Sequence, residues 1–486
     1  MNRPKTLARY TIGGGGLFTA AVVASSPQTV LVGGIPTMYR TTGVASVPLS
    51  FLIVMVVIGL LAVGYVRVGR RVKHGAPFYA QLVHGASPWA GLVAAGVAFV
   101  GYNALQISLY PLLGTTLAGL FGGIWWWWAA GAWLVVFWLG RHPGAVNAKL
   151  LGVLLALELA VIVLFIAAGF SRPASGSISM QVFAPGGLLA AGSVASVVVF
   201  AVAAFAGLET VLAYAEEAKT SRALEWAAGT SIAVCGILYC LASWAYGGWV
   251  GLDQLADATA DDNRQPLALL DAVFGPGILE LATLLLVTSV LAAMGALSAA
   301  VARYVFALSR EGVLPASWGT VSRGAAGGAP LGGSTVQAVT AALVLGVFLA
   351  VGADPLGVVF PWLSTIGAFC VLLLLTASSW SALNFFDRGR GGADSVLVRR
   401  VFPFAGGIAG VLAVVFMASS LGALLGTPPG SPLPWLIAVP IGAAALAGLA
   451  AGSWLRAYRP EIYDGLGLGV PAPERVLDDD LAEIEI

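Results

Sequence analysis

Two glutamates lie inside long apolar stretches, where a charged carboxylate has a high free-energy cost. Glu158 lies in the segment LLGVLLALELAVIVL, and Glu209 lies in the segment FAGLET. A charged side chain at the centre of a membrane helix costs about 2.5–3.5 kcal/mol on insertion scales, so such a residue indicates a function by default. Both are candidates for binding the proton in a proton-coupled process. The structural alternatives are a protonated Glu158 bonded to the first or eighth membrane span, and a Glu209 that caps half of a broken helix.

The segments around residues 25–29 and 205–210 interrupt two apolar runs. Pro27 removes a backbone donor and clashes with the preceding turn, and Gly207 is flexible. A helix broken at mid-membrane exposes N–H groups and carbonyls that can bind the carboxylate and the ammonium of a zwitterion; a simple packing kink at Pro27 is the alternative. A substrate is therefore expected to bind at the two interruptions, whose positions Pro27 and Gly207 mark.

A third polar group lies in the segment AFVGYNALQISLY, which holds Tyr102, Asn103, Gln106 and Tyr110. In a helix, residues 103, 106 and 110 share one face. Such a stripe either lines a pathway through the protein or forms hydrogen bonds between membrane helices. Tyr102, Asn103 and Gln106 are therefore candidates for lining the pathway.

The composition requires these segments to be membrane helices. Of the 486 residues, 59% are hydrophobic and 10% are charged, and the mean hydropathy is +0.91, whereas soluble domains carry about 25% charged residues. A membrane-spanning helix needs about 20 mostly apolar residues, and in lipid its backbone must be satisfied within the segment. The sequence predicts an all-α integral membrane protein with twelve spans, at about 10–37, 45–66, 89–117, 124–140, 150–170, 187–215, 227–250, 277–302, 333–352, 356–383, 401–426 and 435–455.

The basic residues orient these spans. If the N-terminus is cytoplasmic, all but three of the 24 Lys and Arg residues fall in cytoplasmic segments, the three exceptions being Arg40, Arg172 and Arg264. Cytoplasmic loops of membrane proteins carry such an excess. We expect both termini to be cytoplasmic and the protein to reside in the plasma membrane.

Several classes of protein are excluded or disfavoured. A net charge of +1 offers no basic patch for nucleic acid. The three cysteines and three histidines show no spacing typical of metal ligands or of a disulfide framework, so we expect no metal site and no cofactor. The sequence has no Gly-x-x-x-x-Gly-Lys-Ser/Thr motif, and a membrane enzyme would need a cluster of His, Asp or Cys that is not evident, so we expect no catalytic residues. A carrier and a channel remain, and they differ in saturation and counterflow.

Four segments carry a family resemblance. Residues 205–219 (FAGLETVLAYAEEAK) and 299–315 (AAVARYVFALSREGVLP) are similar to the sixth span and the end of the eighth span of one superfamily. Residues 98–110 and the motif SSPQTVLVGG at 25–34 are similar to its third and first spans. The chain thus resembles the amino acid–polyamine–organocation (APC) permeases, in one bacterial branch, over about residues 10–455.

The resemblance implies a fold and a site. Two inverted five-helix repeats, at about 10–170 and 187–383, would be followed by two helices at about 401–455 and by a cytoplasmic tail at 456–486, with the first and sixth helices broken. The substrate would lie between Ser25, Ser26, Gln28 and Thr29 of span one and Phe205, Ala206, Gly207 and Glu209 of span six, under Phe205 as an aromatic lid. Glu158 would take the place of a lysine that in several permeases replaces a coupling sodium ion.

These inferences predict a secondary active transporter for an amino acid or related amine, which works by alternating access as a proton symporter. Sodium is the alternative coupling ion. An exchanger is the alternative mode, and a polyamine or a nucleobase is a further alternative cargo. The expected partners are the small-molecule substrate and the lipid bilayer, without nucleic acid, and the oligomeric state stays open.

Overall fold

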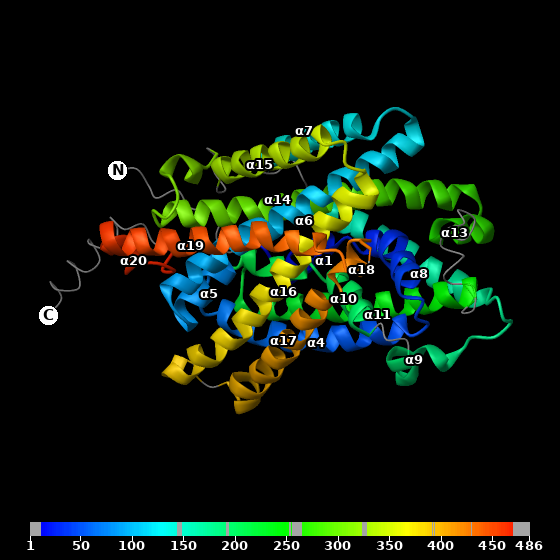
Figure 1. Ribbon diagram of the computed structural model, residues 1–486, viewed down its shortest axis with the longest axis horizontal. Coiled ribbons are helices and arrows are strands. Elements are labelled where there is room, and N and C mark those ends of the chain that lie inside the picture. The colour runs from blue at the N-terminus through cyan, green and yellow to red at the C-terminus, as the bar shows by residue number, and fades with distance from the viewer. Residues whose placement is uncertain are drawn as a thin grey trace.

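The computed structural model describes residues 11–142, 148–190, 194–251, 254, 265–322, 328–390, 392, 394–428 and 430–469. These residues form helices and connecting turns, and no β-strand occurs within them (Figure 1). Eleven helices of this part of the chain are long and apolar enough to cross a membrane. The predicted all-α membrane fold is therefore confirmed.

Each span overlaps a predicted apolar run, but several ends differ; the eighth span, for example, ends at Arg310, where the apolar run predicts an end near residue 302. The helix α7 (Trp125–Arg141), which is the predicted fourth span, has 17 residues and is shorter than each of the eleven. The count of twelve spans therefore stays a prediction, and so does the inverted repeat. Six other spans are single helices, namely α4 (Val47–Gly69), α6 (Pro88–Phe121), α8 (Ala148–Ser171), α11 (Ser221–Val250), α14 (Pro276–Arg310) and α15 (Leu331–Ala350). Two spans are interrupted helices, namely Gly14–Thr42, which comprises α1 to α3, and Val194–Tyr214, which comprises α10 and η3. The last three are composed of η7 (Pro355–Val359), α16 (Phe360–Phe385) and η8 (Phe386–Arg390), of η9 (Leu397–Val401) and α17 (Phe402–Ser419), and of η10 (Leu433–Ile437) and α19 (Ala438–Tyr458).

Short helices connect the spans at both ends of the molecule. At one end lie α5 and α20, together with Arg67 in the last turn of α4, Arg310 in the last turn of α14 and Arg303 about two turns before it; this is called the basic end below. At the opposite end lie α9 and α13 (Figure 1). The bounds of the short elements are α5 (Pro77–Gly85), η2 (Met180–Phe183), α9 (Pro185–Ala190), α13 (Pro266–Phe274), η6 (Ala316–Gly319), α18 (Leu421–Leu424) and α20 (Pro460–Tyr463).

The long helix α6 is the centre of the scaffold, and it packs against α16, α14, α19 and α7. Small residues allow this close packing, as is common between membrane helices. A Cβ atom on Gly101 would lie 2.6 Å from Cβ of Cys370, and one on Gly367 would lie 2.4 Å from Cγ of Leu105. The backbones of α6 and α16 thus approach each other directly, which fixes the wall that faces the broken helices.

Both predicted helix breaks are present. Span one is divided into α1 (Gly14–Ser25), α2 (Pro27–Thr29), the π-helix η1 (Val30–Gly34) and α3 (Ile35–Thr42). Span six changes from α10 (Val194–Ala204) to the 3₁₀ helix η3 (Leu208–Tyr214) after three non-helical residues. Pro27 begins the second part of span one, where its missing N–H is not needed, and Gly207 begins the second part of span six with a positive φ of 105°.

Candidate functional site

The break in span one leaves a backbone carbonyl without its helical donor. Ser26 has a φ of 47°, which is the left-handed region and ends α1. In an unbroken helix the N–H of Gln28 would donate to the carbonyl of Ala24. Here it donates to Oε1 of Glu158, at 2.9 Å. The sequence predicts this break, and the carboxylate of Glu158 in α8 accepts the hydrogen bond that the N–H of Gln28 would otherwise donate within the helix.

The breaks of spans one and six touch each other. A Cβ atom on Gly207 would lie 2.6 Å from the carbonyl oxygen of Ala24 and 3.0 Å from the nitrogen of Ser25. The N–H of Gly207 donates to Oε2 of Glu209, at 2.9 Å, so this carboxylate stabilises its own turn. Two regions about 180 residues apart in the sequence are therefore in backbone contact, and only a glycine at position 207 permits it.

A cavity of about 410 Å³ ends on these breaks, which is within the range of roughly 300–1,000 Å³ typical of small-molecule sites. It is called the central cavity below. Arg40 and Thr41, in the last turn of α3, and Leu425, which directly follows α18, also line it, away from the basic end. Of the predicted substrate residues, four line the central cavity, namely Ser25, Ser26, Thr29 and Ala206, whereas Pro27, Gln28, Phe205, Gly207 and Glu209 do not.

Glu158 is connected to the central cavity by hydroxyl groups. Its Oε1 atom accepts a hydrogen bond from Ser289 Oγ of α14 at 2.9 Å. Ser289 Oγ lies 3.0 Å from Ser26 Oγ, which lies 2.7 Å from Oγ1 of Thr29. Ser26 and Thr29 line the central cavity, and Glu158 is buried. The result is a continuous chain of hydrogen bonds from the cavity to the carboxylate, and no sequence motif points to Ser289 as its middle member.

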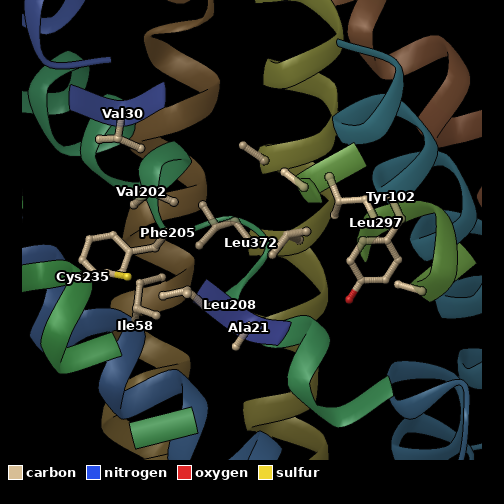
Figure 2. Packing of buried hydrophobic residues seen from close by; sticks show 14 of the residues in the cluster. Ala21, Val30, Ile58, Tyr102, Val202, Phe205, Leu208, Cys235, Leu297 and Leu372 are labelled. Carbon is tan, nitrogen blue, oxygen red and sulfur yellow. The ribbon is translucent and has the colours of Figure 1, made fainter. Parts of the chain in front are cut away.

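Glu209 lies behind the break, next to a second and much smaller cavity of about 30 Å³, which has room for about one water molecule. Phe205, Ile58 and Leu372 line the same small cavity, and Figure 2 shows where these side chains lie in the packed interior. Phe205 packs edge-on against Tyr239, with ring centroids 5.7 Å apart. Its predicted role as a lid over the substrate therefore stays a prediction, because in this conformation the ring lies inside the wall.

The polar stripe of α6 is buried and takes part in hydrogen bonds between and within helices. Asn103 Nδ2 donates to the carbonyl of Phe99 at 2.8 Å, and Gln106 Oε1 accepts from Gln337 Nε2 of α15 at 2.7 Å. None of Tyr102, Asn103 and Gln106 lines the central cavity. Ser108 of the same helix does line it, and so do Ser364 and Thr365 of α16. These hydroxyls are too common in sequence to be singled out without the fold.

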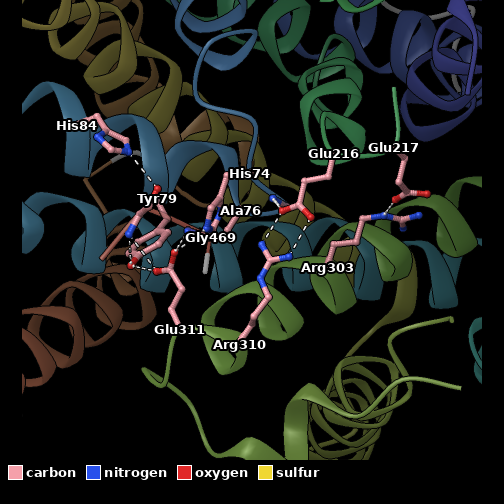
Figure 3. Close-up of polar contacts among 12 residues, drawn as sticks. His74, Ala76, Tyr79, His84, Glu216, Glu217, Arg303, Arg310, Glu311 and Gly469 are labelled. Carbon is pink, nitrogen blue, oxygen red and sulfur yellow. Dashed lines mark hydrogen bonds and ion pairs between the residues drawn. The ribbon is translucent and has the colours of Figure 1, made fainter. Parts of the chain in front are cut away.

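Ion pairs hold the basic end together (Figure 3). Nε of Arg303 donates to Glu217 at 2.7 Å, and Arg310 donates through both terminal nitrogens to Glu216, at 3.0 and 2.7 Å. Burial raises the pKa of Glu216, but the hydrogen bonds and charge of Arg310 outweigh it and hold that pKa below its usual value. Because Glu216 and Glu217 follow η3 and both arginines belong to α14, these pairs tie the sixth span to the eighth.

Hydrogen bonds from the N-terminal and C-terminal segments add to this end. The N–H groups of Thr11 and Ile12 donate to the carbonyl of Glu217, at 2.9 and 3.0 Å. The carboxylate of Glu311, which directly follows α14 and is fully buried, accepts from Tyr79 Oη at 2.6 Å (Figure 3). It also accepts from the N–H of Gly467 at 3.0 Å. Ion pairs and backbone hydrogen bonds therefore close the basic end, and the central cavity opens toward the opposite end.

Comparison with known proteins identifies the family. The sequence profile of the family described as amino acid permease matches residues 16–446, which is nearly the whole chain. The chain belongs to this family. The match spans both helix breaks and the central cavity. A search of curated protein sequences found no significant match for the permease.

Solved structures share the fold of the permease at low sequence identity. A manganese transporter from Eremococcus coleocola, crystallised with an aromatic bis-isothiourea substituted compound, has a TM-score of 0.56 and 13% identity, and the match covers 93% of this chain and 98% of that one. A point mutant of that transporter gives a TM-score of 0.54 at 13% identity, with 91% and 93% covered. The permease therefore has a transporter fold, and its own residues must indicate the cargo.

Proposed function

We propose that this permease carries an amino acid or a related amine across the membrane by alternating access, and that it does so as a proton symporter. The observation that carries the proposal is the central cavity, which ends where the breaks of spans one and six meet. Such breaks supply the unpaired backbone groups that bind zwitterions in transporters with discontinuous helices. Family membership supports a secondary transporter, and the position of the cavity at the breaks supports an amino acid or a related amine as the cargo.

The backbone at the breaks suits the head group of an amino acid. The carbonyl of Ala24 has lost its helical donor to Glu158 and can accept from an ammonium group. The hydroxyls of Ser25, Ser26 and Thr29 line the same part of the central cavity and can donate to a carboxylate. Among the described residues, no group of three or more His, Cys, Asp or Glu side chains could hold a metal ion. The lining thus favours an amino acid over the manganese that the structural neighbours carry.

Glu158 is positioned to couple a proton to the break. Its carboxylate accepts from the Gln28 N–H and from Ser289, so it stabilises the present shape of span one. A proton that reaches Glu158 along the hydroxyl chain would neutralise the carboxylate and weaken both charge-assisted hydrogen bonds. The start of the second half of span one would then be released, which links protonation to movement of the helix that binds the substrate.

Alternating access requires that one end opens as the other closes. The basic end is closed by the pairs Glu216–Arg310 and Glu217–Arg303, and the central cavity opens away from it. Because basic residues favour the cytoplasmic side, we propose that this conformation faces outward. Import would then require the ion pairs between the sixth and eighth spans to separate.

The test is uptake by purified protein in proteoliposomes. A thermal-shift screen with amino acids, polyamines and nucleobases, at two pH values and with or without sodium, first identifies a ligand. Uptake of that ligand is then measured with an inward proton gradient and, separately, as exchange against internal ligand. Saturable uptake and counterflow are expected of a carrier, and their absence would indicate a channel.

Glu158→Gln is the decisive variant for coupling. We expect it to abolish uptake driven by the proton gradient and to spare exchange, because glutamine can keep a hydrogen bond to the break but cannot bind a proton. Glu280→Gln is the matched control, since Glu280 is an exposed residue of α14. An unchanged pH dependence of uptake in Glu158→Gln would contradict the proposed role.

A further inference from the structure

The wall of the central cavity above the breaks is mostly apolar. Phe51, Phe200, Leu297, Phe360 and Met417 line it, and they come from five different helices, α4, α10, α14, α16 and α17. The hydroxyls of Ser25, Ser26 and Thr29 lie together at the break in span one. The head group of a substrate and its side chain therefore meet different surroundings.

Charge is almost absent from this wall. Among the described residues that line the central cavity, Arg40 is the only ionisable one, and it lies exposed in the last turn of α3, at the rim. The two buried acids of the region are outside the lining and already accept hydrogen bonds. Glu158 accepts from Gln28 and Ser289, and Glu209 accepts from the N–H of Gly207. A second charge on the cargo would thus have no partner of opposite sign deep in the cavity.

We infer that the central cavity selects amino acids with uncharged, apolar side chains, an inference that rests on the proposed function. Burying a charged group without a partner costs several kcal/mol after relaxation, whereas apolar atoms gain by leaving water. Cationic amino acids, diamines and polyamines are rejected because the wall offers no carboxylate. Dicarboxylic amino acids are rejected because Arg40 lies at the rim.

Matched pairs of ligands isolate the side-chain charge. Ornithine has the shape of norleucine with an ammonium group in place of the terminal methyl, and glutamate has the shape of glutamine. Binding of each to the full-length protein is measured by competition against the ligand found in the thermal-shift screen. We expect norleucine to bind at least about a hundredfold tighter than ornithine, which corresponds to the cost of an unpaired buried charge. From alanine to norvaline to norleucine, affinity should rise about fourfold for each added methylene.

A substitution in the wall should change this selectivity. Ser108 of α6 lines the central cavity, is buried and donates only to its own helix, at the carbonyl of Leu105. We expect Ser108→Asp to bring ornithine to within tenfold of norleucine, because the new carboxylate supplies the missing partner. Ser108→Asn has nearly the same size without the charge and should keep the preference of the wild type. Arg40→Gln should leave the preference for norleucine over ornithine unchanged.

Each outcome separates this inference from the proposed function. If ornithine or putrescine binds as well as norleucine, the selectivity is wrong and the transporter function stands. If glutamate binds better than glutamine and loses that advantage in Arg40→Gln, the cavity is built for acidic cargo, which also overturns the inference. If no amino acid or amine binds or is transported, the proposed function fails and the inference fails with it.

Discussion

Replacing Gly207 by alanine would place a methyl group at the point where spans one and six touch. The added Cβ would lie 2.6 Å from the carbonyl oxygen of Ala24 and 2.8 Å from its carbon, and both are backbone atoms that cannot rotate away. Gly207 also has a φ of 105°, which alanine rarely adopts. The backbone strain costs roughly 1–2 kcal/mol, and the overpacking costs roughly 1–3 kcal/mol. The conformation in which the two breaks touch is therefore destabilised by about 2–5 kcal/mol.

This cost should appear in transport, because the touching breaks form the substrate site. At 1.4 kcal/mol for each factor of ten, we expect uptake by Gly207→Ala in proteoliposomes to fall by about 30-fold or more, together with a lower melting temperature. Gly229→Ala is the matched control, since Gly229 lies in α11 with nothing within 4 Å of an added Cβ. The contact between the breaks would be refuted as an element of the site if Gly207→Ala transported like the wild type at equal amounts of folded protein.

Two further predictions follow from the buried hydrogen bonds. Ser289→Ala interrupts the hydrogen-bond chain between Ser26 and Glu158, so we expect uptake driven by a proton gradient to fall at least tenfold while exchange persists. Thr288→Ala is the control, because the Thr288 hydroxyl donates only within its own helix, to the carbonyl of Leu285. Equal losses of gradient-driven uptake and of exchange in Ser289→Ala would argue against a proton relay. Burial raises the pKa of Glu311, but hydrogen bonds from His74, Tyr79 and Gly467 outweigh it and lower that pKa to about 2. Because the pKa is depressed in the folded state, the stabilisation, about 3 kcal/mol, is complete above the ordinary value of 4.5 and is lost as the pH falls from there toward 2. The melting temperature of Glu311→Gln should therefore lie below that of the wild type at pH 7, and the difference should shrink below pH 4.5; a difference independent of pH would contradict this reasoning.

Much of the fold could be read from the sequence because a membrane imposes simple rules. Spans must be long, apolar and helical, so the apolar runs predict each helix but not its ends. The helix α14, for example, continues past the apolar run to Arg310, and α7 is shorter than the other spans. The breaks could also be predicted, because Pro27 and Gly207 change the backbone itself and do so locally. These are effects of covalent geometry and solvation, and they do not depend on neighbouring helices.

The partners of the buried groups could not be predicted in the same way. Glu158 is conspicuous in the sequence as an acid in an apolar run, but its bonds to Gln28 and Ser289 join residues more than 120 positions apart. Likewise, Asn103 and Gln106 form a polar stripe on one face of a helix, and only the packing of α6 against α15 turns Gln106 toward Gln337.

The sequence by itself thus determined that this chain is a bundle of membrane helices with two interruptions and two buried acids. The tertiary structure decided that the interruptions meet, that Ser108, Ser364 and Thr365 line the cavity, and that Phe205 and Glu209 lie behind its wall. The physical reason is that a residue's burial and polarity follow from its own segment, whereas its contacts depend on the rotation and crossing of every helix packed around it.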